Sequence, residues 1–218
     1  MKTLPSKAKI SGFTLVELLL VIFVIAVLAA MLLPVLSGNH KGAPQSVCLM
    51  NLKQIDVEYL MWADDHGGKF PAQVPLADKG AMEFVSTGYA SLQFRMLSKY
   101  LRYPYFFICP ADKSKHTATN CEVLRDENLS YFINVDVTTN NPSKSILAGD
   151  RNLLSDGQPV QPGLFELTTN LNLNWSGELH LHGGNLAFAD GHVEWNRTGG
   201  LKAIIQEQPL ATNRLCIP

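Results

Sequence analysis

The sequence predicts an α+β protein, in which a hydrophobic N-terminal helix is followed by an amphipathic helix packed on an antiparallel β-sheet. Three observations lead to this prediction. Apolar residues run almost without interruption from Phe13 to Leu33. A second segment repeats apolar residues at helical spacing, and a third, near the C-terminus, alternates polar and apolar residues between short turn sequences. The last segment needs a cover for its apolar face, which the second helix supplies.

The first helix is expected over residues 13–36, as a transmembrane or assembly helix. Its apolar stretch from Leu18 to Leu36 reaches the roughly 18 residues that can cross a bilayer. One carboxylate, Glu17, stands at its start. A charge costs about 2.5 to 3.5 kcal/mol at the centre of a membrane helix, so such an acid usually has a partner and a function.

Residues 1–12 are expected to be a leader peptide. They contain Lys2, Lys7 and Lys9 and no acid, whereas only Lys41 lies close behind the apolar stretch. This asymmetry favours a cytoplasmic N-terminus and an exported C-terminal part.

The segment Ser11-Gly12-Phe13-Thr14-Leu15-Val16-Glu17 resembles the signal of type IV pilins and type II secretion pseudopilins. The resemblance implies that a prepilin peptidase cleaves between Gly12 and Phe13 and methylates the new terminal phenylalanine. It implies that Glu17 neutralises the terminal ammonium of a neighbouring subunit during filament assembly. It also implies a pilin-like fold and a structural, non-enzymatic subunit, held in the inner membrane and then assembled with other pilin-like subunits into a type II secretion or type IV pilus-like filament.

Two other interpretations of the N-terminus are open. A secretory signal peptide has an apolar core of about 7 to 15 residues, which is shorter than this stretch and should not contain Glu17. A plain membrane anchor is the stronger alternative. It corresponds to a different function, that of an inner-membrane-anchored periplasmic domain that binds a metal or a glycan.

Three further segments extend the resemblance. The stretches Cys48 to Gln54 and Ile108 to Asp112 look like recurring segments of a large bacterial pseudopilin group. The C-terminal region of that group carries a histidine, nine residues and then Asp-Gly, which here are His180 and Asp190-Gly191. We name this stretch the H-x9-DG element; the resemblance implies no biochemical role for it.

Residues 37–46 are expected to form a hinge, because glycine costs about 1 kcal/mol and proline about 3 kcal/mol in a helix. The second helix is expected to resume at Gln45 and to end at the glycines and proline between Asp64 and Pro71. Its apolar residues follow spacings of four and three and form one stripe: Cys48, Leu52, Ile55, Tyr59 and Trp62. This stripe is expected to pack against the sheet, and residues 71–173 are expected to form loops between short strands.

The exported domain, residues 47–218, is long enough for one compact unit. A formal net charge of -1 and the lack of a basic cluster argue against nucleic-acid binding. The four cysteines are an even number that an oxidising compartment lets pair in three ways: Cys48, Cys109, Cys121 and Cys216. Pairing of Cys109 with Cys121 is one hypothesis, and Cys48 with either is the alternative. The cysteine spacing, without a C-x-x-C pair, argues against a structural zinc site.

Residues 178–196 are expected to form a three-stranded β-meander, because Gly183-Gly184 and Asp190-Gly191 are typical hairpin turns. Tight turns would pair Phe188 with Val193 and Leu186 with Trp195. Six apolar side chains would then share one face, which is expected to cover the helical stripe: Leu179, Leu181, Leu186, Phe188, Val193 and Trp195.

The same register would place His180, His182, His192 and Glu194 on the opposite face. Imidazole and carboxylate groups bind zinc, which makes His180, His182, Asp190 and His192 candidate ligands. The favoured alternative is a solvated polar face in which Asp190 serves only its turn, and a calcium site on Asp190 is a third hypothesis. No nucleophile stands beside a base in a known catalytic motif, so no catalytic residue is predicted.

Overall fold

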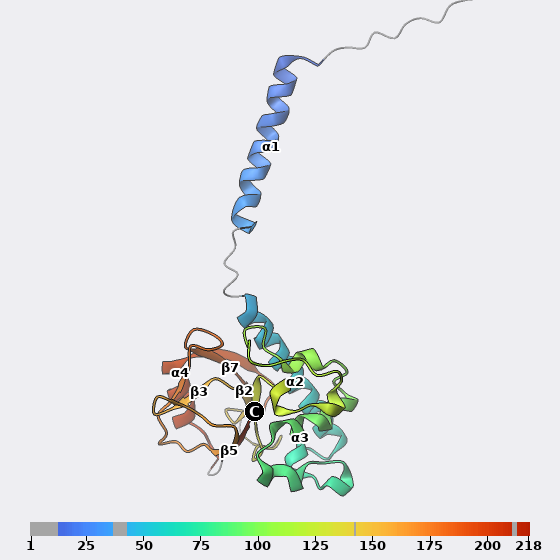
Figure 1. The fold of residues 1–218 in the computed structure, drawn as a ribbon, viewed down its shortest axis with the longest axis vertical. Coiled ribbons are helices and arrows are strands. Elements are labelled where there is room, and N and C mark those ends of the chain that lie inside the picture. The colour runs from blue at the N-terminus through green and yellow to red at the C-terminus, as the bar shows by residue number, and fades with distance from the viewer. Residues whose placement is uncertain (1–12, 37–42, 142, 211–212) are drawn as a thin grey trace, which may run out of the picture. The chain divides into compact units, whose positions relative to one another are not determined.

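The computed structural model describes residues 13–36, 43–141, 143–210 and 213–218, and it describes no side chains for residues 32–36 and 43 (Figure 1). The chain divides into two units, residues 1–40 and 41–218. The first contains helix α1 (Leu15–Leu36). Within the described part of the chain, no helix is both long enough and apolar enough to cross a membrane.

The second unit begins with helix α2 (Ala43–Asp65). Residues 43–46, which we assigned to the hinge, are therefore helical. Pro44 stands in the first turn, where its missing N–H is not needed for a helical hydrogen bond. The helix ends where Gly67 adopts a φ of 67° and the Gly68 amide donates to the Ala63 carbonyl at 2.8 Å.

Between α2 and the first strand the chain forms short helical turns rather than the predicted short strands with loops. Prolines, glycines and small polar residues interrupt this stretch too often for a long helix. The turns are α3 (Ala90–Phe94), η1 (Pro71–Gln73), η2 (Leu76–Asp78), η3 (Met82–Thr87), η4 (Arg95–Lys99), η5 (Pro104–Phe107), η6 (Cys121–Val123) and η7 (Asp126–Asn128).

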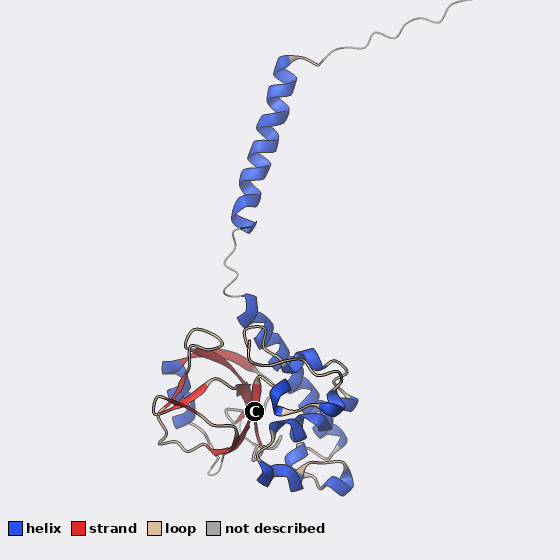
Figure 2. Ribbon diagram, in the orientation of Figure 1, coloured by secondary structure: helices blue, strands red, loops and turns tan. Residues whose placement is uncertain are grey.

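The strands form two antiparallel sheets (Figure 2). The larger sheet has the order β5-β9-β1-β2-β7-β8 and the smaller has the order β4-β3-β6. The strands are β1 (Tyr131–Asn134), β2 (Ile146–Asp150), β3 (Leu153–Ser155), β4 (Gln158–Pro159), β5 (Gly163–Glu166), β6 (Leu173–Trp175), β7 (Gly183–Phe188), β8 (Val193–Arg197) and β9 (Arg214–Ile217). With α2 on the large sheet, the predicted α+β, pilin-like architecture is confirmed.

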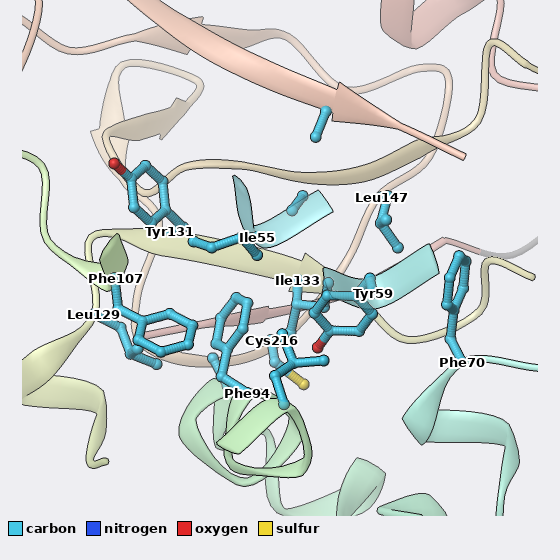
Figure 3. Close-up of a cluster of buried hydrophobic side chains, with 14 of the residues drawn as sticks. Ile55, Tyr59, Phe70, Phe94, Phe107, Leu129, Tyr131, Ile133, Leu147 and Cys216 are labelled. Atoms are coloured by element: carbon cyan, nitrogen blue, oxygen red, sulfur yellow. The ribbon is translucent and has the colours of Figure 1, made fainter. Parts of the chain in front are cut away.

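The large sheet separates two cores. On one side, all five residues of the predicted α2 stripe are buried and pack among aromatic and aliphatic side chains from α3, η5 and β1 (Figure 3). The sheet contributes small residues to this core, namely Ala148 and Ala187, as well as the larger Tyr131 and Leu147, and Ala189 follows directly after β7. On the other side, Leu186 and Phe188 join Leu201 and Ile205 of α4 (Thr198–Gln206).

The predicted pairing within the C-terminal hairpin is wrong by one residue. Ala187 pairs with Val193, Asn185 with Trp195, and Leu186 with Glu194. The Gly191 amide donates to the Phe188 carbonyl at 2.9 Å, and Gly191 has a φ of 88°. This is a three-residue turn closed by a left-handed glycine, not a two-residue turn. The shift places Ala187 rather than Leu186 on the face of Val193, and both Ala187 and Val193 lie in the core with α2.

The first strand of the predicted meander does not form. Residues 178–182 make a turn in which Leu181 and His182 have φ of 51° and 64°. Gly183 and Gly184 lie inside β7, where an added Cβ would stand 2.7 Å from the Trp195 ring and 2.5 Å from the Trp175 ring. These glycines therefore admit two indole rings rather than turn the chain.

We predict that Gly191→Ala destabilises the domain more than Gly157→Ala. Both glycines have positive φ, which costs alanine about 1 to 2 kcal/mol. A Cβ at Gly157 meets open space, whereas one at Gly191 lies 3.0 Å from Leu60 Cδ1 on α2. Urea denaturation should show an additional loss of about 1 kcal/mol for the Gly191 variant. Equal losses would mean that the turn does not pack closely on α2.

Candidate functional site

The start of α1 is closed by a reciprocal cap between Thr14 and Glu17. The Thr14 amide and hydroxyl donate to Glu17 Oε2 at 2.7 and 2.8 Å, and the Glu17 amide donates to Thr14 Oγ1 at 3.3 Å. This is a capping box, in which each residue satisfies an amide that the helix leaves unpaired. The sequence Thr-x-x-Glu carries this signal, and our sequence analysis missed it. Gly12, the predicted cleavage residue, lies outside the described residues.

Every described side chain from Phe13 to Met31 is exposed. Almost all of them are apolar, and Phe13 itself is 73% exposed. Exposed apolar surface of this extent is typical of segments that contact lipid or other protein subunits. Glu17 is the one acid on this surface, and its Oε2 is already engaged by Thr14.

In the second unit, the segments that the sequence analysis singled out meet on α2. Cys48 and Cys109 form a disulfide between the first turns of α2 and the chain that follows η5. Next to it, the Asn51 side chain donates to the Ile108 carbonyl at 3.0 Å. Of the pairing hypotheses, Cys109 with Cys121 is wrong and Cys48 with Cys109 is confirmed, while Cys121 and Cys216 are buried free thiols.

The Asp112 side chain holds the segment of residues 108–112 in place. Arg151 binds it with two hydrogen bonds, from Nε at 2.7 Å and from Nη2 at 2.9 Å, and Ser130 donates to it at 2.9 Å. Burial opposes ionisation of Asp112, but the hydrogen bonds from Arg151, Ser114 and Ser130 outweigh it and lower the pKa of this carboxyl. Arg151 also binds Glu178 at 2.8 Å, which ties the chain before His180 to the same cluster.

The histidine of the H-x9-DG element lies against the disulfide. His180 Nε2 is 3.3 Å from Cys109 Sγ and 3.5 Å from Asp150 Oδ2. The side chains of all three residues are buried. Asn185 donates to Asp150 Oδ2 twice, from its amide at 2.7 Å and from Nδ2 at 2.8 Å. Burial raises the pKa of Asp150 to about 7 and lowers that of His180, so both groups are driven toward their neutral forms.

The Asp-Gly end of the element contacts α2 about two turns further along. Lys53 Nζ donates to the Gly191 carbonyl, and Asp56 Oδ2 lies 3.8 Å from Lys53 Nζ. Asp190 closes the turn itself, since its Oδ1 accepts from the His192 amide at 3.1 Å and pairs with His192 Nδ1. The His192 ring stacks on Phe188 with centroids 4.2 Å apart.

The proposed metal ligands of the meander therefore do not share one face. His180 is buried before β7, His182 is exposed, and Asp190 and His192 lie together beyond the far end of β7. The physical reason is the lost first strand and the shifted hairpin, which removed the common face on which the hypothesis depended. What the sequence analysis did not foresee is that His180 meets two cysteines and Asp150 instead.

Comparison with known proteins concerns the N-terminus alone. Residues 7–33 match the family model described as the prokaryotic N-terminal methylation motif, and the match includes Gly12, Phe13 and Glu17. No curated protein and no solved structure matches the chain. The match supports a type IV pilin-like class of protein that carries a prepilin signal and is processed by prepilin peptidase.

Asp56 gives a pH-dependent prediction. Its two oxygens are buried without a hydrogen-bond partner among the described residues, and burial, opposed by Lys53, raises its pKa to about 7. The folded state therefore keeps a proton that the unfolded chain releases near pH 4, so stability falls between about pH 4 and pH 7. Asp56→Asn should remove this pH dependence. Its free energy of unfolding should exceed that of the native protein by about 2 to 4 kcal/mol at pH 8, but not at pH 4.

Denaturation in urea at pH 4, 6 and 8 measures this difference, with exposed Asp78→Asn as the matched control. A pH dependence for Asp56→Asn identical to that of the native protein would show that Asp56 ionises freely in the folded state.

Proposed function

We propose that this protein is a pilin-like structural subunit, of the pseudopilin kind, of a type II secretion or type IV pilus-like filament. The observation that supports it most directly is the prepilin signal at residues 7–33, joined to a helix whose apolar side chains have no cover within the described chain. An apolar helix of this kind is stable only in lipid or among other helices. A filament subunit uses both environments in turn.

In this proposal the unassembled protein spans the inner membrane once, with its leader in the cytoplasm and its second unit exported. Prepilin peptidase removes residues 1–12 and methylates Phe13. Helix α1 then leaves the bilayer and packs with the α1 helices of other subunits, while the exported domain lies on the filament surface. The role is structural, and no catalytic step is assigned to the domain.

Glu17 has two states in this scheme. Before assembly its carboxylate closes the cap with Thr14. In the filament it pairs with the terminal ammonium of a neighbouring Phe13, which offsets the cost of a charge away from water. Because Gln also fits the last position of a capping box, the charge of Glu17 and its capping role are separable by substitution.

The first test concerns processing. Gly12→Leu should leave an unprocessed precursor in the membrane fraction, because a bulky side chain stands at the bond to be cut. Intact-mass measurement should give a native chain that starts at methylated Phe13. Gly199→Leu, at a site with open space around it, should be processed normally. A native protein that still starts at Met1 would overturn the proposal.

The second test concerns assembly. Glu17→Gln should be processed and inserted, yet be depleted from filaments released by shearing, because the charge is gone while the cap acceptor remains. Thr14→Ala is the converse control: it loses about 1 kcal/mol of cap but keeps the acid, and should assemble. Normal incorporation of Glu17→Gln would exclude the pairing. Processed native protein that never sediments with fibres would favour a membrane-anchored binding domain instead.

A further inference from the structure

One cluster of metal-binding side chains lies deep in the second unit and has no part in the proposed function. The described residues contain one group of three or more such side chains whose ligand atoms all lie close together, namely Cys48, Cys109 and His180, within 4.8 Å of one another. The three come from α2, from the chain after η5 and from the turn before β7. All three are buried.

A fourth candidate ligand lies next to His180, outside the group of three ligand atoms that are all within 4.8 Å of one another. The Asp150 carboxylate lies at the end of β2 with Oδ2 3.5 Å from His180 Nε2. Its Oδ1 is buried and accepts no hydrogen bond from any described residue. An unsatisfied carboxylate oxygen in the interior costs free energy, so a cation beside it would be stabilising.

The two distances around His180 Nε2 fit those between neighbouring ligands of a tetrahedral metal centre. Zinc binds nitrogen and oxygen at about 2.0 to 2.1 Å and sulfur at about 2.3 Å, so neighbouring ligand atoms in a tetrahedral site are about 3.3 to 3.8 Å apart. His180 Nε2 is 3.3 Å from Cys109 Sγ and 3.5 Å from Asp150 Oδ2. Both distances fall in that range, and the same imidazole nitrogen faces both partners.

We propose that, in its dithiol form, the Cys48–Cys109 pair binds one zinc ion together with His180 and Asp150. Disulfide formation and zinc binding are then alternative states of one buried site. The disulfide form holds no metal, because both sulfurs are bonded to each other. Asn185, which donates twice to Asp150, orients the carboxylate in either state.

Conversion of the disulfide form to the zinc form requires a reductant, which can be a dithiol. The dithiol gives two electrons and two protons to the disulfide and itself becomes a disulfide, leaving Cys48 and Cys109 as thiols. Zinc then displaces the two thiol protons to solvent and binds the thiolates, while His180 binds as neutral imidazole through Nε2.

The test uses the full chain in detergent, reduced with a phosphine, with Co²⁺ as the probe. The reduced native protein should bind one Co²⁺ with thiolate-to-cobalt charge-transfer absorption, and Zn²⁺ should abolish that absorption by displacement. The disulfide form should show none. Absence of the charge-transfer band in the reduced, folded protein would overturn the proposal.

Variants identify the ligands. His180→Gln, which keeps much of the size and polarity of the side chain, should weaken Co²⁺ binding at least about tenfold. Exposed His182→Gln, two residues away, should bind as the native protein does. The fold of each variant is first compared with that of the native chain in the disulfide form, which binds no metal. Equal Co²⁺ affinities for the two variants would exclude His180 as a ligand.

Loss of structure on reduction is also informative. If the reduced metal-free chain unfolds, zinc should restore its near-ultraviolet circular dichroism, since binding then drives folding. Failure of zinc to restore this signal would overturn the proposal. Recovery in the native chain and in His182→Gln, but not in His180→Gln, would support it.

Discussion

The packing of α2 against the large sheet is the contact on which the rest of the second unit depends. The helix packs its large side chains against alanines of the sheet and against Tyr131 and Leu147 in one core. Interiors are packed at the density of organic crystals, and such a contact tolerates little change in volume on either side. The alternation of side chains along this part of the chain places Ala187 and Ala189 in the core that contains the α2 stripe and sends Leu186 and Phe188 to the core with α4.

The H-x9-DG element now has a physical interpretation. Its two ends hold β7 to α2 at separate turns of the helix, through His180 beside the disulfide and through Gly191 on Lys53. Each end has a buried carboxyl next to it, Asp150 or Asp56, whose pKa burial raises to about 7. Buried acids weaken a domain near neutral pH, so these two are unexpected in a purely structural clamp. In the zinc-bound dithiol form that we propose, the buried Asp150 carboxylate has a cation as its partner.

Sequence patterns predicted what depends on local periodicity. The α2 stripe followed from spacing alone, and the position of the C-terminal hairpin followed from Asp190-Gly191. The patterns failed where contacts between residues far apart in the sequence determine the structure. Gly183-Gly184 has the composition of a turn but is selected by two tryptophan rings from β6 and β8. Likewise, the disulfide joins cysteines 61 residues apart, and no local signal distinguishes this pairing from the others.

The topology of the large sheet also constrains how the domain reaches its final state. Strand β9, the last of the described strands in the sequence, lies inside the sheet between β5 and β1. Strands β1 and β5 thus remain unjoined until residues 214–217 arrive. Long-range pairings of this kind form late and slowly in folding. A chain that emerges N-terminus first would therefore keep this sheet open until its last strand is available, and the unpaired strand edges would be prone to aggregation until that segment closes the sheet.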